Sequence, residues 1–384
     1  MIIKTTWQEQ IKHSIRTIDD LEQRCDCKFE PTEKVTLQRI TEKYPMSITP
    51  HYASLIDWKD RDDPLRRIVV PRTEESLKPG VCDTDDGYGE EKSTVLPGLE
   101  HKYGPTALLL VTDQCPSICR ECFRKAYVSK DQKDFQRNVL TPSNYQKAAD
   151  YIKEHPEIDD VLISGGEPLM MCSTVLDSLL SALTQAPNVR KIRIGTKMFA
   201  YLPQRITEDE GLARVLEKYA NKVQIRVIHH FNHAREISQE SKKAIKKLSK
   251  LGIRHYNQAV LLKGINDNSE TLKELFTELD NSGVIPYYLF QKMPQRGTAH
   301  LEVQLEEGFR LFQEAYFGLE GTAQTVKYFI PDEDCKRQVL DVCERDGRTF
   351  VKTRYLKVAR HYQGPINLET EVPSQPEKKC PDYL

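Results

Sequence analysis

The sequence predicts an α/β fold, an incomplete (βα)6 barrel of the TIM type with an N-terminal helical extension and a small C-terminal cap. Two observations support this prediction. Between residues 106 and 314, short runs rich in Val, Ile, Leu and Tyr alternate with longer amphipathic segments, as in repeated strand–helix units. The unusual polar and cysteine residues directly follow the apolar runs, where a parallel barrel carries its chemistry.

Six strands are predicted in this region, because each apolar run resembles a strand that is buried on both faces of a parallel sheet. They span residues 107–112, 161–164, 191–195, 223–229, 256–262 and 285–291. Helices are expected between them, and polar residues suited to cap their first turns precede several of these segments. The predicted caps are Thr141 with Ser143, Ser238 with Glu240, and Asn268 with Glu270.

The chain is expected to divide into three parts. Residues 1–97 form a helical and irregular extension, residues 98–320 the partial barrel, and residues 321–384 a cap with a flexible tail. The extension and the cap have weaker patterns than the barrel. They predict helices at 7–23 and 31–43, irregular wrapping at 48–97, strands at 325–330 and 348–357, and a flexible tail from residue 371.

The composition argues against several classes of partner. Among 384 residues, 56 Lys and Arg nearly balance 57 Asp and Glu, so no overall field favours nucleic acid or an anionic membrane. The N-terminus does not resemble a secretory signal, and no apolar run is long enough to span a membrane. We therefore expect a cytoplasmic protein that acts on a small molecule, with a homo-oligomeric state left open. In that compartment ten cysteines are more readily metal ligands or buried thiols than disulfides.

Cys115, Cys119 and Cys122 follow the first predicted barrel strand with C-x3-C-x2-C spacing. Three thiolates without a fourth cysteine nearby suit an iron-sulfur cluster that keeps one iron open to a reactant. Clusters held by four cysteines usually carry electrons only. The alternatives are a structural zinc site, which normally takes four ligands, or three unrelated thiols.

Gly165, Gly166 and Glu167 follow the second predicted strand. Adjacent glycines let a backbone approach a ligand closely and offer N–H groups, while the carboxylate is able to hold an ammonium. A Gly-Gly pair alone is also an ordinary turn. Its position one strand–helix unit after the cysteines favours a binding role.

With these motifs in this order, the sequence resembles the radical S-adenosylmethionine (SAM) enzymes, and within them the lysine 2,3-aminomutase family. The resemblance extends from about residue 98 to 291. It is carried by Gly98-Leu-Glu-His-Lys-Tyr103, the cysteine loop through Arg124, Ser164-Gly-Gly-Glu167, Ile194-Gly195, Leu202-Pro-Gln-Arg-Ile206, His230-Phe-Asn-His233, Asn257-Gln258, Leu261-Leu-Lys-Gly-Ile-Asn266 and Pro286-Tyr-Tyr288.

The resemblance implies a 4Fe-4S cluster on the three cysteines, whose open iron binds the amino and carboxylate groups of SAM. One electron, from a partner such as flavodoxin or ferredoxin, then cleaves the sulfonium to give methionine and a 5′-deoxyadenosyl radical. The residues implied to contact SAM are Gly165, Gly166 and Glu167 at its methionine part and His230 and Gln258 near its adenosyl group.

The sequence departs from the aminomutases where they bind pyridoxal phosphate. Those enzymes carry it on a lysine in a glycine-rich C-terminal loop, whereas residues 325–337 contain Lys327 and Lys336 but no glycine cluster. A family arginine that helps hold the cofactor phosphate aligns with Thr106. The family aspartate that binds the amine of the substrate side chain aligns with Met293. We therefore expect hydrogen abstraction from a small amino-acid-like or carboxylate substrate without pyridoxal phosphate.

Two other functions stay open at this point. One is a pyridoxal-phosphate-dependent isomerase of the lysine 2,3-aminomutase type that uses Lys327 or Lys336. The other is a metal-binding module without turnover. The reaction that follows hydrogen abstraction is not specified by the motifs.

Several residues are candidates for substrate contact. Arg124 matches the family and suits an anionic group, whereas the others lie at predicted strand ends, where polar residues also simply emerge into water. These others are Lys197, His229, Tyr288 and Lys292. Four further cysteines are candidates for a second cluster, although buried free cysteines are common and the spacing is not distinctive. They are Cys172, Cys335, Cys343 and Cys380.

Overall fold

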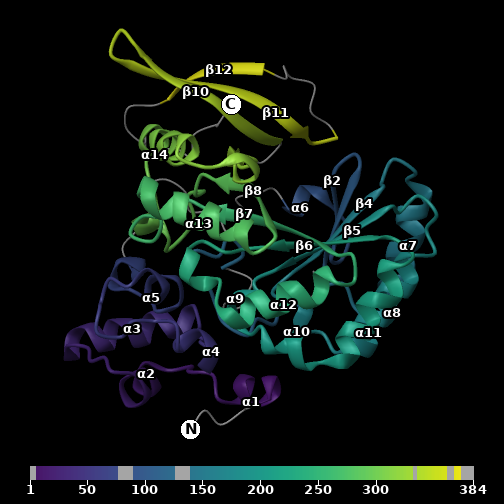
Figure 1. The fold of residues 1–384 in the computed structure, drawn as a ribbon, viewed down its shortest axis with the longest axis horizontal. Helices are drawn as coiled ribbons and strands as arrows, with labels where there is room; N and C mark the ends of the chain where they lie inside the picture. Colours follow the sequence, from purple (N-terminus) through teal and green to yellow (C-terminus); the bar gives the residue numbers. More distant parts are fainter. Residues whose placement is uncertain (1–5, 77–89, 126–138, 332–334, 361–366, 373–384) are drawn as a thin grey trace.

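The computed structural model describes residues 6–76, 90–125, 139–331, 335–360 and 367–372 (Figure 1). Within these residues, twelve strands form one sheet in the order of the chain, from β1 to β12. Strands β3 to β9 are parallel neighbours, and antiparallel strands flank them at both ends. The predicted incomplete barrel is confirmed, and it has one parallel strand more than expected.

The six predicted barrel strands correspond to β3 through β8, with small shifts at their ends. Their residues are apolar and buried, as the side chains of a sheet covered on both faces must be. The bounds are β3 (Thr106–Leu110), β4 (Asp160–Ser164), β5 (Lys191–Thr196), β6 (Gln224–His229), β7 (Arg254–Val260), β8 (Val284–Phe290) and β9 (Lys327–Pro331).

Strands from the two ends of the sheet meet across the gap in the barrel. β1 (Thr94–Leu96) and β2 (Leu99–Tyr103) precede β3, and β10 (Cys335–Arg345), β11 (Arg348–Val358) and β12 (Asn367–Val372) follow β9. Tyr103 forms an isolated antiparallel bridge with Ala359. The backbone N–H of Arg360 donates to the carbonyl of Lys102 at 3.0 Å. The end of β11 therefore lies against β2 and spans the open side of the barrel.

Helices cover the outer side of the parallel strands (Figure 1). The longer helices bury one stripe; in α13, Leu272, Leu275, Phe276 and Leu279 are three and four residues apart and all buried. The bounds are α7 (Tyr145–Glu154), α8 (Ser173–Leu183), α9 (Met198–Tyr201), α10 (Gln204–Glu208), α11 (Glu210–Ala220), α12 (Gln239–Ser249), α13 (Ser269–Asn281) and α14 (Leu305–Phe317). Among the described residues, no helix has the length and apolar character needed to cross a bilayer.

Two of the predicted helix caps are confirmed. The Ser238 hydroxyl accepts from the N–H of Ser241 at 3.1 Å, and Asn268 accepts from Thr271 at 2.8 Å. The prediction for Thr141 and Ser143 is wrong. Their hydroxyls hydrogen-bond each other at 2.9 Å, and α7 begins after Asn144 without a side-chain cap.

The N-terminal extension contains more helix than predicted. The expected single helix at 7–23 is broken, because buried Ile15 pairs with Ile48 through two backbone hydrogen bonds. The described residues of segment 48–97, namely 48–76 and 90–97, are not irregular throughout: Thr49 and Asp63 cap short helices whose first residue is proline, which is tolerated there because that N–H needs no partner. The bounds are α1 (Trp7–Lys12), α2 (Ile18–Arg24), α3 (Pro31–Lys43), α4 (Pro50–Ala53), α5 (Pro64–Val69) and α6 (Glu90–Ser93).

The C-terminal part continues the barrel sheet. The strand predicted at 325–330 is β9, which pairs with β8, and the strand at 348–357 is β11. Strands β1, β2, β10 and β12 were not predicted. Residues 371–372 belong to β12, and the rest of the expected tail lies outside the described residues. At both expected boundaries, 97/98 and 320/321, the strand before the boundary pairs with the strand after it. The division into three parts stays a proposal.

A buried ionic cluster connects the N-terminal extension to the cysteine loop. The Glu75 carboxylate accepts from the Arg120 guanidinium at 2.9 and 2.6 Å and from the Lys125 ammonium at 2.6 Å. Arg120 also donates to the carbonyls of Tyr44 and Pro45. Burial raises the pKa of Glu75, but the two cations bring this pKa down to about 2. The loop that carries the cysteines is thus held by charges from the extension.

Replacing Glu75 tests this connection. Glu75→Gln leaves two buried cations without their anion, so we expect the free energy of unfolding to fall by about 3 to 5 kcal/mol. Because the folded pKa of Glu75 lies below the ordinary value, its contribution is complete above about pH 4.5 and is lost as the pH falls toward 2. Urea unfolding of both proteins across this range measures the difference.

The matched control is Glu74→Gln. Glu74 is the neighbouring residue, and its partly exposed carboxylate pairs with Arg72 at the surface, where the loss is at most about 1 kcal/mol. Equal effects of the two substitutions would contradict the proposed role of the cluster.

Candidate active site

A cavity of about 350 Å³ lies at the carboxyl ends of the parallel strands, within the size range of small-molecule sites. The last residue of every parallel strand from β4 to β9 lines it, as in barrels that carry their chemistry on this face. These residues are Ser164, Thr196, His229, Val260, Phe290 and Pro331. Residues of β2 and β10 line the same cavity, so the strands that span the gap complete its wall.

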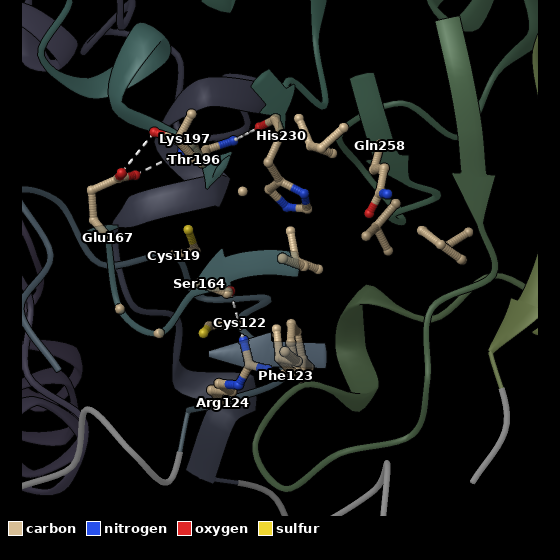
Figure 2. A pocket seen from close by; sticks show the side chains of 18 of the residues that line it. Cys119, Cys122, Phe123, Arg124, Ser164, Glu167, Thr196, Lys197, His230 and Gln258 are labelled. Atoms are coloured by element: carbon tan, nitrogen blue, oxygen red, sulfur yellow. Dashed lines mark hydrogen bonds between the residues drawn. The ribbon is translucent and has the colours of Figure 1, made fainter. Parts of the chain in front are cut away.

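Cys115, Cys119 and Cys122 all line this cavity from the loop after β3. Figure 2 shows Cys119 and Cys122 on the same side of the hollow, with His230 and Gln258 beyond them. Burial raises the pKa of all three thiols. The Cys119 sulfur lies 2.9 Å from the Tyr201 hydroxyl. Since metals bind thiolates, loading this site releases protons.

The cysteine loop is fixed by backbone and hydroxyl contacts from the N-terminal extension. The Ser47 hydroxyl donates to the carbonyl of Pro116 at 2.9 Å, and the backbone carbonyl of Ser47 accepts from the N–H of Ile118 at 3.0 Å. The N–H of Thr49 donates to the Ser117 hydroxyl at 3.0 Å. These contacts position the loop without using the cysteine side chains.

The glycine turn after β4 packs directly on the start of the cysteine loop. Gly166 N–H donates to the carbonyl of Thr112 at 2.6 Å, and Glu167 N–H to that of Gln114 at 2.8 Å. A Cβ at Gly165 would lie 2.4 Å from the Thr112 oxygen, and Gly165 has a φ of +125°. We expected the turn to offer its N–H groups to a ligand, but these two are engaged within the protein. The glycines permit this close approach of two loops.

Glu167 lines the cavity, but the residue is only 2% exposed and its carboxylate already accepts hydrogen bonds from within the protein. It accepts from the Thr196 hydroxyl at 2.7 Å, the Lys197 N–H at 2.8 Å and the Leu169 N–H at 3.1 Å. Burial raises the pKa of Glu167 to about 7 against the effect of these donors. The side chain therefore shapes the turn between β5 and α9 (Figure 2).

Lys197 lies in the same wall, at the start of α9. Its ammonium contacts Glu236 at 2.7 Å and donates to the carbonyl of His230 at 2.7 Å. Burial lowers the pKa of Lys197, but Glu236 and the other nearby anions raise this pKa above its ordinary value. Glu236 also accepts from the Tyr52 hydroxyl at 3.0 Å. Lys197 thus ties the ends of β5 and β6 to the N-terminal extension.

Glu121, between two of the cysteines, was not among the residues singled out from the sequence. It is buried and lines the cavity. Its Oε1 accepts from the Asn232 amide at 3.0 Å and lies 3.7 Å from the ring of His230. Its place within the cysteine motif was the available signal. Gln258, from β7, lines the cavity on the same side as His230 (Figure 2).

Arg124 lines the cavity below the cysteines and is already paired. Its guanidinium donates to Glu90 at 2.7 Å and to the Ser164 hydroxyl at 3.2 Å. Lys292 also lines the cavity; its ammonium donates to the Thr298 hydroxyl at 2.9 Å, and burial lowers its pKa to about 8. His229 lines it as well, with one ring nitrogen 2.9 Å from His255.

Tyr288 differs from the other candidates for substrate contact. It does not line the cavity; its hydroxyl donates to Tyr287 at 2.6 Å and its ring packs against Phe329. Tyr288 lies on the same face of β8 as the cavity-lining Phe290 but two residues further from the carboxyl end of the strand, so its ring lies deeper in the barrel.

The two lysines considered for pyridoxal phosphate lie in different surroundings. Lys336, on β10, lines the cavity, with its ammonium over the ring of Phe290 at 5.3 Å. Lys327, on β9, is exposed. The two residues that depart from the family pattern, Thr106 and Met293, both line the cavity. Both predicted departures from the family pattern therefore fall in the cavity wall.

The cysteines considered for a second cluster do not gather into one group. Cys335 lines the cavity, Cys343 is eight positions further along β10, and Cys172 is exposed before α8. Among the described residues, none of these cysteines belongs to a group of three possible metal ligands whose ligand atoms lie within 4.8 Å of one another. Cys380 lies outside the described residues.

Comparisons with known proteins identify the family. A family model described as the radical SAM superfamily matches residues 109–276. A protein of Aquifex aeolicus is 40% identical over 310 residues, which are 80% of this chain and 80% of that protein. The L-lysine 2,3-aminomutase of Methanococcus maripaludis is 35% identical over 370 residues, 94% of this chain and 80% of that protein.

This chain belongs to the lysine 2,3-aminomutase family of radical SAM proteins. The L-lysine 2,3-aminomutase of Clostridium subterminale is 33% identical over 95% of this chain and 84% of that protein. Among solved structures, a radical SAM methyltransferase from Sphaerobacter thermophilus is a weak match, with a TM-score of 0.39 and 19% identity over 60% of this chain and 68% of that one.

The protein is therefore a radical SAM enzyme, and the family implies a 4Fe-4S cluster and SAM. The three thiols fit such a cluster better than a single ion. Thiolates around one tetrahedral zinc lie about 4 Å apart, because each Zn–S bond is about 2.3 Å. The three cysteine sulfurs do not form a group within 4.8 Å, as expected for ligands of separate irons. The residues predicted to contact SAM also line this cavity. Their contacts with SAM stay a prediction.

Gly166→Ala tests the close approach between the two loops of this radical SAM site. The added Cβ would lie 2.6 Å from the Gln114 carbonyl oxygen, so the cysteine loop must shift. We expect the free energy of unfolding to fall by about 1 to 3 kcal/mol. Bound iron and sulfide after anaerobic reconstitution should fall as well.

Gly195→Ala is the matched control, since Gly195 lines the same cavity but its Cβ would have its nearest neighbour at 3.6 Å, an ordinary contact. Full iron and sulfide content in Gly166→Ala would contradict the role of this turn.

Proposed function

We propose that this radical SAM enzyme removes a hydrogen atom from a small amino-acid-like or carboxylate-bearing molecule, without pyridoxal phosphate. The observation that carries the proposal is one cavity that is lined both by the three cysteines and by the altered residues Thr106 and Met293. When bound, the cluster and SAM supply a 5′-deoxyadenosyl radical. Cys115, Cys119 and Cys122 would hold the cluster.

The strand-end side chains would protect such a radical. Ile228, Val260, Phe290, Met293 and Pro331 line the cavity, and all are apolar. Apolar walls exclude water and leave few reactive partners near a radical other than the bound substrate. Met293 and Pro331 offer no charge to a substrate side chain, which argues against a distal ammonium group in this part of the cavity.

Among the polar candidates for substrate contact, Arg124 suits an anionic group best. Its guanidinium, which already binds Glu90 and Ser164, is a planar fork whose geometry matches that of a carboxylate. Lys197 is held between Glu236 and the carbonyl of His230 and so would position the wall. For Lys292, the bond to Thr298 supports a similar positioning role.

One observation favours a second candidate, an isomerase that uses pyridoxal phosphate. The L-lysine 2,3-aminomutases are relatives of this chain, and Lys336 lines the cavity. Against this candidate, Thr106 replaces the family arginine expected at the cofactor phosphate, and residues 325–337 contain no glycine cluster. A small reducing protein such as a flavodoxin or ferredoxin is the proposed electron donor for either reaction.

Cleavage of SAM tests the proposed function. Reconstituted protein with dithionite, SAM and a mixture of perdeuterated amino acids is expected to form methionine and deuterium-containing 5′-deoxyadenosine, both measured by mass spectrometry. Cys119→Ser should form neither, because the cluster loses a ligand. Cys172→Ser is the control, since Cys172 is exposed and does not line the cavity. Absence of 5′-deoxyadenosine from a wild-type protein with a full cluster would overturn the proposal.

Pyridoxal phosphate binding separates the two candidates. We expect wild-type protein incubated with pyridoxal phosphate and borohydride to gain no stoichiometric adduct by intact mass, because the family phosphate arginine is replaced by Thr106. The isomerase predicts one adduct per chain that disappears in Lys336→Ala and persists in Lys327→Ala, whose lysine is exposed. That result would replace the first proposal by the second.

A further inference from the structure

A second cavity, of about 130 Å³, lies in the N-terminal extension. Its wall contains residues of α3 and α5, which Figure 1 shows in the extension, and of the segment that follows α5. It shares no lining residue with the cavity that contains the cysteines. Its volume is larger than one water requires and smaller than that of sites for whole small molecules. The cavity therefore suits a small group.

Charged side chains make up most of the lining of this second cavity. Four of the lining residues are arginines and two are glutamates. Three of the four guanidiniums form ion pairs with carboxylates: Arg61 with Glu33, Arg67 with Asp62, and Arg72 with Glu74 and Asp62. The remaining guanidinium is that of Arg66. The second cavity thus has one cation more than the carboxylates around it neutralise.

Arg66 is also the most buried of the four arginines, with 5% of the residue exposed. Its Nη1 donates to the carbonyl of Asp60 at 3.4 Å, and its guanidinium lies 5.7 Å from the ring of Phe29. Among the described residues, this guanidinium forms no ion pair and no other hydrogen bond. Arginine stays charged in proteins, and an unpaired buried charge is costly. The side chain therefore calls for an anion from outside the chain.

The surroundings of Arg66 add to this cost. Burial lowers the pKa of Arg66, and the neighbouring Arg61 and Arg72 lower it further. Cys27 opposes this effect only if it is a thiolate, and burial raises the pKa of that thiol, which is therefore neutral. The Nε of Arg67 is buried as well and has no hydrogen-bond partner among the described residues. Two guanidiniums in one wall thus have donors that the protein does not use.

The second cavity adjoins the segment that holds the cysteine loop. Residues 72–74 line it, and the next residue, Glu75, binds the Arg120 guanidinium of the cysteine loop at 2.6 Å. The backbone N–H of Arg72 donates to the Glu75 carboxylate at 3.2 Å. An anion held between Arg66 and Arg72 would restrain this segment, and with it the carboxylate that anchors the loop.

We propose that the second cavity binds a phosphate-type oxyanion through Arg66, and that the bound anion stabilises the segment that anchors the cysteine loop. A planar carboxylate is matched by a single guanidinium fork. A phosphate group presents oxygens in several directions, and the arginines reach the cavity from before α5, from α5 itself and from after it. Free phosphate or the phosphoryl group of a small metabolite supplies this chemistry. The site is separate from the proposed reaction.

Calorimetric titration of the reconstituted protein with inorganic phosphate tests the site. Chloride keeps the ionic strength constant, so that general screening does not contribute. We expect saturable binding to wild type, and a Kd that rises about ten- to hundredfold in Arg66→Met, which loses charged hydrogen-bond donors. Arg66→Lys keeps the charge but not the fork, so its affinity should be intermediate. Acetate should bind wild type more weakly than phosphate.

Stability distinguishes a binding role of Arg66 from a structural one. Removing an unpaired buried cation should not destabilise the fold, so without phosphate the urea midpoint of Arg66→Met should equal or exceed that of wild type. Phosphate should raise the midpoint of wild type, as a ligand of the folded state does, and leave that of Arg66→Met unchanged. Phosphate should likewise slow the release of cluster iron to a chelator in wild type only.

Two further comparisons complete the test. Glycerol phosphate identifies the source of the anion: binding at least as tight as that of inorganic phosphate assigns the site to a phosphorylated metabolite, and weaker binding assigns it to free phosphate. Arg214→Met, on the exposed side of α11, is the matched control and should behave like wild type. The inference is overturned by any of four results: no saturable binding to wild type, acetate binding as tight as phosphate, a lower midpoint of Arg66→Met without phosphate, or iron release that phosphate does not slow.

Discussion

Two backbone hydrogen bonds, from Gly166 to Thr112 and from Glu167 to Gln114, fix the geometry on which the site depends. They join the loops after two neighbouring parallel strands at a distance that only glycine permits. Because the cysteines follow Thr112 directly, their positions are set from the sheet side by this junction. The glycines thus hold the cysteine loop in place. Contact with SAM would be a second, separate role.

The N-terminal extension holds the same loop from the opposite side. Ser47 and Thr49 bind its backbone, and Glu75 neutralises Arg120 and Lys125 within it. Burying three charges is costly unless every one is paired, and here the pairing requires the extension to be folded. Formation of the cysteine loop and folding of the extension are therefore coupled, although Glu75 lies 45 and 50 positions before Arg120 and Lys125 in the sequence.

Sequence patterns predicted the parts of the structure that depend on local order. Strands β3 to β8 were predicted because buried parallel strands leave continuous apolar runs, and the cysteines because their spacing is distinctive. Strand β2 was missed, and so was its bridge from Tyr103 to Ala359, because no local sequence pattern marks a pairing between residues so far apart in the chain. Tyr288 was assigned to the cavity because it lies near a predicted strand end, but it is two residues short of the strand-end residue Phe290 that reaches the cavity. Glu121 was missed because a carboxylate next to cysteines looks like an ordinary surface charge until its burial is known.

The contact between the end of β11 and β2 has a consequence for how the protein is made. The cysteines and the glycine turn leave the ribosome before β10 and β11, which complete the cavity wall. Until those strands are made, the cavity wall beside the three thiols is incomplete. The nascent chain thus has an interval in which a preformed cluster could be delivered through that opening, and the last strands then close over it.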